Sequence, residues 1–286
     1  PMKCNMPAVR MKKITICGFG LIGGCMALDS LNSKSKVKVH AFDRPNVLKR
    51  LSKDKHFRVT CESYFGQAVS NADIVVLSAP HQANEQMLVR LAKMKSLSNC
   101  LILDTGAVKQ PIAKLSARLN FGEGTQFLPT HPMAGKEKAG FENSAAKLFV
   151  NHSWFIDESV CLTKLNKTKL YWMTKLLGAK PTYIDNPLHD ELMSEISHLP
   201  QLISTILGGQ VNPYLIPLAG PGLRSMLRLA GSPYSVWSEI IEQNKTDIIK
   251  ALKLFRDNLG KVTRMIETGQ PLDDVFKAAS RSYKCL

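Results

Sequence analysis

Residues 18–23 carry three glycines at a spacing that could bind the pyrophosphate of a dinucleotide. An apolar, β-branched run at 14–17 precedes them, and a segment with helical spacing follows at 21–31. This order of strand, loop and helix is the context in which a G-x-G-x-x-G motif binds a dinucleotide. The first glycine permits a tight turn, the second lets the main chain approach the phosphates, and the third lets the helix pack against the strand. The candidate loop consists of Gly18, Phe19, Gly20, Leu21, Ile22 and Gly23.

A carboxylate follows the next predicted strand. Asp43 comes directly after residues 37–42, about 20 residues beyond the last glycine of the loop. A carboxylate at this point can accept hydrogen bonds from the ribose hydroxyls, and it repels a 2′-phosphate. We therefore predict NAD as the cofactor and consider NADP less favoured, although the neighbouring Arg44 could weaken that preference. The alternative is a glycine turn that binds nothing, and the strand, glycines, helix and acid together argue against it.

Two later loops could bring chemistry to the same crevice. Ser78, Ala79 and Pro80 follow a buried apolar run, and loops at the carboxyl ends of parallel strands line the cofactor crevice. They are therefore candidates for the nicotinamide side of the site. His131 lies just after another predicted strand, in the glycine-containing segment 130–135. A neutral histidine can act as a general base near pH 7, and a purely structural histidine is the alternative.

Five segments follow one another along the chain: Gly18–Gly23, Asp104 with Val108-Lys109, His131-Pro-Met-Ala-Gly135, His189-Asp190, and Ser197-His198-Leu199-Pro200. Together they resemble the prephenate and arogenate dehydrogenase family of tyrosine biosynthesis. The resemblance runs from about residue 12 to about residue 255 and covers most of the chain. It implies that NAD+ takes a hydride from the ring carbon that bears the 4-hydroxyl, while His131 accepts the hydroxyl proton. The ring carboxylate then leaves as CO2 and the ring becomes aromatic.

The resemblance also implies a set of substrate-binding residues. Arg228, at the end of the segment 222–228, matches the arginine that holds a substrate carboxylate in the family. A guanidinium suits that task because it can bind a carboxylate through two parallel hydrogen bonds. Further candidates for the pocket are His189, His198, Trp237, Gln201, which stands where some members have a second histidine, and Lys136, which could serve an acidic substrate.

The chain departs from the family pattern at two informative positions. Ala107 stands where the family usually has a serine whose hydroxyl lies close to the catalytic histidine, and Ser225 stands where the pattern has an aspartate. The first change permits a slower enzyme, an altered substrate, or replacement of the hydroxyl by Thr105 or water. Two alternatives to a prephenate or arogenate dehydrogenase therefore stay open. One is a dehydrogenase for a related cyclohexadienyl compound such as a 4-amino analogue, and the other is a non-catalytic NAD-binding paralogue.

The pattern of elements predicts two domains. Strand and helix patterns alternate up to about residue 185, which is typical of a doubly wound α/β fold. Beyond residues 186–187 the pattern is helical only, with single helices predicted over 188–207, 235–268 and 272–282. We therefore predict a Rossmann-like NAD-binding domain over residues 10–185 and an all-helical substrate and dimerisation domain over residues 186–286.

The composition indicates which partners and which cellular compartment to expect. The seven cysteines form no C-x-x-C pair, which indicates reduced thiols in a cytoplasmic protein. Residues 199–223 carry no charge until Arg224, but four prolines interrupt them, so we predict buried core or a homodimer interface and not a membrane span. The net charge of +15 is spread along the chain without a nucleic-acid motif, so we expect a small anionic substrate, no nucleic acid and no metal.

Overall fold

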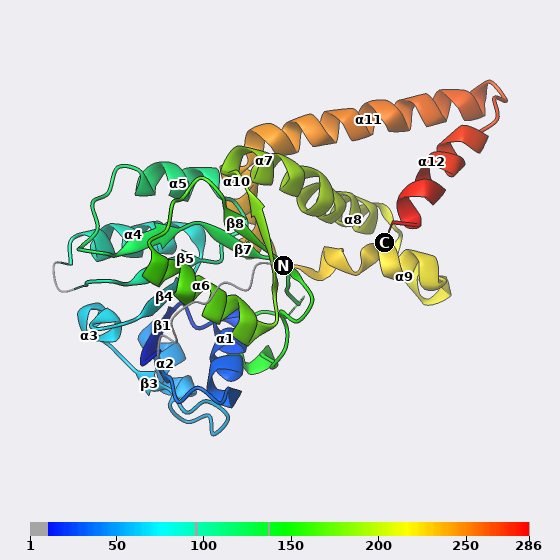
Figure 1. The fold of residues 1–286 in the computed structure, drawn as a ribbon. Helices are drawn as coiled ribbons and strands as arrows, with labels where there is room; N and C mark the ends of the chain where they lie inside the picture. Colours follow the sequence, from blue (N-terminus) through cyan, green and yellow to red (C-terminus); the bar gives the residue numbers. More distant parts are fainter. Residues whose placement is uncertain (1–10, 95–96, 137, 286) are drawn as a thin grey trace.

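A parallel sheet of six strands forms the centre of the N-terminal part (Figure 1). The computed structural model describes residues 11–94, 97–136 and 138–285. The strand order β3-β2-β1-β4-β5-β6 is that of a dinucleotide-binding Rossmann fold, as predicted. The strands are β1 (Lys13–Cys17), β2 (Lys38–Phe42), β3 (Thr60–Cys61), β4 (Ile74–Leu77), β5 (Leu101–Asp104) and β6 (Gln126–Leu128).

Helices cover both faces of this sheet because its strands are apolar on both sides. In β1, Ile14 and Ile16 pack into one core cluster, whereas Cys17 packs into another on the opposite face. One face carries α1 (Leu21–Asn32), α2 (Pro45–Leu51) and α6 (Lys164–Leu177). The other face carries α3 (Phe65–Val69), α4 (His81–Ala92) and α5 (Gln110–Ser116).

A second, three-stranded sheet was not predicted as a separate unit. It contains β7 (Thr130–Pro132), β8 (Ser153–Asp157) and β9 (Lys180–Ile184), and β7 runs antiparallel to β8. A short 3₁₀ turn at Phe141–Asn143 lies between β7 and β8 in the chain. Pro129 separates β6 from β7, and β7 then pairs with β8 and not with the large sheet. This change of sheet places His131 opposite Phe155.

The residues described beyond 185 form helices and no strand. They are α7 (Asn186–Met193), α8 (Leu199–Gln210), α9 (Pro221–Leu227), α10 (Tyr234–Gln243), α11 (Lys245–Glu267) and α12 (Asp273–Tyr283), with 3₁₀ turns at Pro213–Leu218 and Leu229–Gly231. A π-helical turn at Ser194–His198 joins α7 to α8, where Pro200 has no N–H to continue regular helical bonding.

One predicted helix is wrong in extent. The single helix over 235–268 is two helices, because Asn244 leaves helical geometry at φ −112° and ψ 25° between α10 and α11. Its side chain instead hydrogen bonds to the α7–α8 segment, which the sequence pattern could not reveal.

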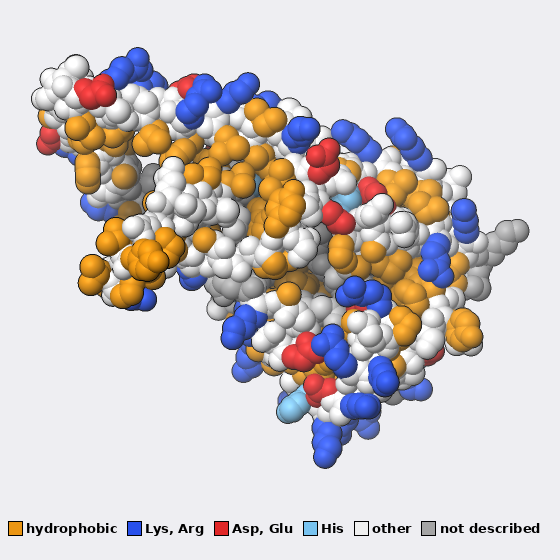
Figure 2. Space-filling view, turned by 180° about the vertical axis from the view of Figure 1, so that it is seen from behind, with side chains coloured by type: hydrophobic (Ala, Val, Ile, Leu, Met, Phe, Trp, Pro, Cys, Tyr) orange, Lys and Arg blue, Asp and Glu red, His pale blue; other side chains and the backbone are white. Residues whose placement is uncertain are grey.

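The helical part projects from the α/β body and exposes many apolar side chains (Figure 2). Tyr214 is 89% exposed and Leu218 is 82% exposed. Both lie in the uncharged stretch 199–223, so this part of the stretch is not buried core within one chain. Among the described residues, no helix combines the length and apolar character that crossing a membrane requires.

Candidate active site

The glycine loop has the geometry that a bound pyrophosphate needs. Gly18 has φ +92°, and a Cβ atom there would lie 2.3 Å from the main-chain nitrogen of Ala79. A Cβ atom at Gly23 would lie 2.5 Å from the carbonyl oxygen of Gly18. A Cβ atom at Gly20 would contact none of the described residues, so the space in front of the loop is open. The free N–H groups of Leu21 and Ile22 begin α1 at this point, which favours an anion.

Asp43 lies across this loop at the end of β2. Its carboxylate accepts the main-chain N–H of Phe19 at 2.5 Å and that of Arg44 at 2.6 Å. The Phe19 ring points into the core, where its centroid lies 5.4 Å from that of Phe57. The side chain of Arg44 is 81% exposed and lies 3.8 Å from Asp43. The acidic group therefore occupies the position expected for a ribose ligand.

The predicted second loop packs directly against the first. Ser78 donates its hydroxyl to the carbonyl of Gly18 at 2.6 Å. Ala79 donates its N–H to Oδ1 of Asn84 at 3.0 Å, and Pro80 precedes the first residue of α4. The two loops thus form one rigid edge at the carboxyl ends of β1 and β4.

His131 belongs to a chain of three side chains, of which His189 and Asp190 are buried. Its Nδ1 atom lies 3.1 Å from Nε2 of His189, and Nδ1 of His189 lies 2.8 Å from Oδ1 of Asp190. A carboxylate can only accept, so Nδ1 of His189 carries a hydrogen and its Nε2 accepts one from Nδ1 of His131. Nε2 of His131 is consequently left without a hydrogen, and no described residue is bonded to it. This tautomer is the one that can take up a proton.

Asp190 is held at the N-terminus of α5, 80 residues earlier in the chain. It accepts the main-chain N–H of Lys109 at 2.7 Å and that of Gln110 at 2.8 Å. The Lys109 ammonium is buried and donates to the Asp104 carboxylate and to the carbonyl of Thr130. Burial lowers the pKa of Lys109, and Asp104 opposes that change. Lys109 therefore ties the end of β5 to the strand that carries His131.

The surroundings keep His131 neutral. Its pKa is lowered well below the usual value of 6.5, chiefly by burial and further by His189, Lys109 and His198. A neutral imidazole is the form that accepts a proton, so His131 is in the state that a general base requires at neutral pH.

His198 offers an unpaired hydrogen-bond donor. The amide of Asn244 donates to its Nδ1 at 3.2 Å and to the carbonyl of Asp190 at 2.7 Å. Burial lowers the pKa of His198 to about 4, so the ring is neutral and its hydrogen is on Nε2. Nε2 is buried and has no partner among the described residues. The ring of Trp237 packs edge-on against the imidazole ring of His198, with the two centroids 5.8 Å apart.

Gln201 and Arg228 lie on neighbouring elements. Buried Gln201 donates its amide to the carbonyl of Leu229 at 2.8 Å, and Ser204 donates to the carbonyl of Met226 at 2.7 Å. These bonds hold the main chain on either side of Arg228, which is exposed at the end of α9. The amide nitrogen of Gln201 is thus engaged by the protein itself.

The remaining candidates lie in less expected places. His189 is only 1% exposed and sits behind His131. Lys136 is exposed, and its ammonium donates to the carbonyl of Asn143 at 3.1 Å. Sequence reasoning missed the roles of Asp190, Asn244 and Lys109, although Asp190 and Lys109 lie within segments that carry the family resemblance.

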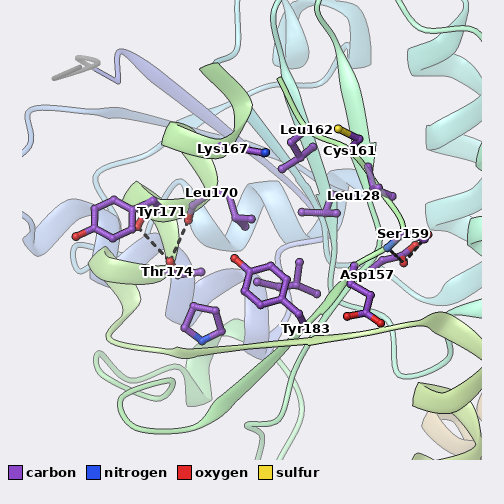
Figure 3. Close-up of a pocket in the computed structure, with 14 residues that line it drawn as sticks. Leu128, Asp157, Ser159, Cys161, Leu162, Lys167, Leu170, Tyr171, Thr174 and Tyr183 are labelled. Carbon is purple, nitrogen blue, oxygen red and sulfur yellow. Dashed lines mark hydrogen bonds between the residues drawn. The ribbon is translucent and has the colours of Figure 1, made fainter. Parts of the chain in front are cut away.

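A separate cavity of about 640 Å³ lies between α6 and the second sheet (Figure 3). Ile156 on β8, Leu170 on α6 and Tyr183 on β9 are among its apolar walls. Of the described residues that we predicted for the site, none lines this cavity. It is therefore not the candidate active site. No group of three or more potential metal ligands occurs in the described part of the chain.

Comparison with known families identifies the class of protein. Residues 29–179 match the nucleotide-binding domain of prephenate dehydrogenase, and residues 185–278 match its dimerization domain. The chain therefore belongs to the prephenate dehydrogenase family and is an oxidoreductase. The matched domain confirms a nucleotide cofactor, and the carboxylate of Asp43 fits NAD.

Individual relatives cover almost the whole chain. Prephenate dehydrogenase of Lactococcus lactis is 27% identical over 279 residues, which are 95% of this chain and 76% of that protein. Cyclohexadienyl dehydrogenase of Zymomonas mobilis is 26% identical and covers 96% of each chain.

Solved structures of the family show the same fold. Prephenate dehydrogenase from A. aeolicus, in complex with hydroxyphenyl propionate and NAD+, superimposes with a TM-score of 0.84 at 23% identity and covers 97% of this chain and 99% of that one. Synechocystis arogenate dehydrogenase superimposes with a TM-score of 0.74 at 21% identity, covering 95% and 99% of the two chains.

Proposed function

We propose that this chain catalyses the NAD+-dependent oxidative decarboxylation of prephenate or arogenate in tyrosine biosynthesis. The observation that carries this proposal is the chain Asp190–His189–His131, which leaves Nε2 of His131 free to accept a proton. His131 follows Thr130, whose main-chain N–H donates to Asp104 at the carboxyl edge of the large sheet. The two cofactor loops lie at that same edge.

His131 starts the reaction by accepting the proton of the ring 4-hydroxyl on Nε2. The electrons of the O–H bond form the carbonyl as the hydride leaves the same carbon, and bound NAD+ supplies the hydride acceptor. The bond between the ring and its carboxylate then breaks and CO2 leaves. The electrons of that bond make the ring aromatic as a phenolate, and protonated His131 returns its proton to the phenolate oxygen. Before the proton transfer, His189 and Asp190 keep the hydrogen of His131 on Nδ1. A serine at position 107 would help to orient His131 in the same way.

Three side chains are proposed to hold the substrate. Arg228 binds a substrate carboxylate, and Nε2–H of His198 donates to a substrate oxygen because it lacks another partner among the described residues. Trp237 forms an apolar wall beside His198. We propose that buried His189 positions His131 and that Gln201 positions the main chain beside Arg228, so neither need contact the substrate.

A direct assay tests this function. The protein and NAD+ are mixed with prephenate in one assay and with arogenate in another. The absorbance of NADH should rise in at least one of them. A rise with one substrate identifies it. NAD+ binding without turnover of either substrate would contradict the proposal and favour a non-catalytic paralogue or a related cyclohexadienyl substrate.

Replacing Arg228 should weaken substrate binding more than turnover. Arg228→Ala removes a charge-assisted contact that exists in both the ground state and the transition state, so KM should rise with a smaller change in kcat. The increase in KM should correspond to a loss of roughly 1.5–3 kcal/mol of binding free energy for each charged hydrogen bond removed. Steady-state kinetics measure it, and Arg224→Ala on the same helix is the matched control. An unchanged KM would remove Arg228 from the substrate site.

We propose that residues 186–286 pair two copies of the chain, with the domain boundary between Ile184 and Asn186. The matched dimerization domain and the exposed apolar residues of the helical part support a homodimer. Light scattering at micromolar concentration should give twice the mass of one chain, and a monomer would contradict the proposal. A cytoplasmic location is part of the proposal, supported by the absence of disulfides among the described cysteines.

A further inference from the structure

A glutamate from the helical part binds the helix that follows the second cofactor loop. The main-chain N–H of His81, the first residue of α4, donates to Oε2 of Glu239 at 2.6 Å. The two residues are 158 positions apart, and Glu239 belongs to α10. Pro80, the N-cap residue of α4, makes no side-chain capping bond, so Glu239 provides the capping carboxylate. A carboxylate at this place is favoured by the free N–H groups and by the helix dipole.

This contact reaches both halves of the candidate site. On the cofactor side, His81 directly follows Pro80, and the loop that ends there is bonded to Gly18 through Ser78. On the substrate side, Trp237 packs against His198 from the same helix as Glu239. Residues two apart on a helix point about 200° apart around its axis. Helix α10 can therefore bind the cofactor loop through Glu239 on one side and place the ring of Trp237 beside His198 on the other.

We propose that Glu239 is a positioning residue that couples cofactor binding to substrate binding. By fixing α10 to the start of α4, it sets the separation between the loop at 78–80 and the pair Trp237–His198. A cofactor that orders the loop then also orders the substrate side, and a substrate does the reverse. The inference rests on the proposed function, because it assumes that His198 and Trp237 face the substrate.

The coupling can be measured by calorimetry without turnover. NAD+ is titrated into the full-length protein with and without saturating 4-hydroxyphenylpyruvate, the product expected from prephenate, or L-tyrosine if the NADH assay selects arogenate. In the wild type we expect each ligand to tighten the other by about 5-fold or more. Glu239→Ala should reduce this factor to less than about 2-fold, while the Kd for NAD+ alone changes by no more than about 2-fold.

Two further variants make the result decisive. Glu239→Gln keeps an oxygen that can accept the His81 bond but loses the charge, so its coupling should be intermediate. Glu242→Ala removes an exposed charge from the same helix and should keep the wild-type coupling. A purely structural role for Glu239 would lower stability without changing the coupling factor. Coupling that is absent in the wild type, or unchanged in Glu239→Ala, would overturn the inference.

The outcomes separate this inference from the function on which it rests. Wild-type protein that turns over neither substrate and binds no product contradicts the proposed function itself. Wild-type protein that turns over substrate and binds product, together with a Glu239→Ala variant of normal coupling, contradicts only the role of Glu239.

Discussion

His131→Asn should lower kcat by about 10²–10⁴-fold, the usual range for loss of a general base. Asparagine is polar and of similar reach, but it cannot accept a proton near neutral pH. The substrate contacts proposed for Arg228 and His198 remain in this variant, so KM should change little. Stopped-flow or steady-state measurement of NADH formation gives both constants. Near-normal turnover would show that another residue is the base.

The pH profile gives this prediction a second readout. Protonated His131 cannot accept the hydroxyl proton, so the wild-type rate must fall as the pH drops through the pKa of His131. Because burial and three neighbouring cationic or titratable groups lower that pKa, the fall should begin well below pH 6.5. The profile of kcat/KM should stay level from pH 7.5 to 6.5. In His131→Asn this acidic limb should disappear, whereas its persistence would assign the limb to another group.

Local sequence patterns predict the residues that we propose for the cofactor half of the site. The glycine loop is recognisable because each glycine meets a short-range steric demand, as Gly18 does against Ala79. Asp43 could be placed because it follows a strand that pairs directly with β1. The position of Ser78 follows from the same rule, since β4 is the other neighbour of β1. All three depend on one parallel sheet, which the strand–helix alternation predicts.

The catalytic half depends on contacts that no local pattern encodes. Asp190 meets Lys109 only because α7 packs against the start of α5. Asn244 breaks a segment with continuous helical spacing because its side chain reaches His198 and Asp190. His131 could be singled out as a base, but its tautomer depends on His189 from another element. The sequence therefore suggests candidate residues more readily than it predicts the contacts that each of them makes.

The second sheet shows the same limit in the fold. Residues 153–156 and 181–184 have the composition of strands and lie within the alternating pattern that runs up to about residue 185. Strand composition does not specify the partner strand, and here β8 and β9 pair with each other and with β7. The pairing matters for function because β8 brings the ring of Phe155 against His189, with centroids 5.3 Å apart.

Asp190→Asn should lower kcat strongly although Asp190 lies two side chains away from the reacting atoms. An asparagine can direct an N–H toward Nδ1 of His189. Nδ1 then accepts this hydrogen bond, and the hydrogen of the His189 ring moves to Nε2. His189 can no longer accept from His131, so the hydrogen of His131 shifts to Nε2 and the base is lost. The loss should approach the ~10⁴-fold that a wrong histidine tautomer costs in a Ser-His-Asp triad.

A matched control separates this effect from damage to the helices. Asp185 caps the same helix α7 and its carboxylate accepts the N–H of Leu188 at 2.8 Å, but this side chain bonds to neither histidine. Asp185→Asn should therefore leave kcat within about 2-fold, since asparagine caps helices about as well as aspartate does. Nitrogen-15 NMR of the imidazoles should show the hydrogen of His131 on Nδ1 in the wild type and on Nε2 in Asp190→Asn. If kcat of Asp190→Asn falls less than about 10-fold with the tautomer unchanged, the asparagine oxygen still accepts from His189 and the charge of Asp190 is not needed to orient the base.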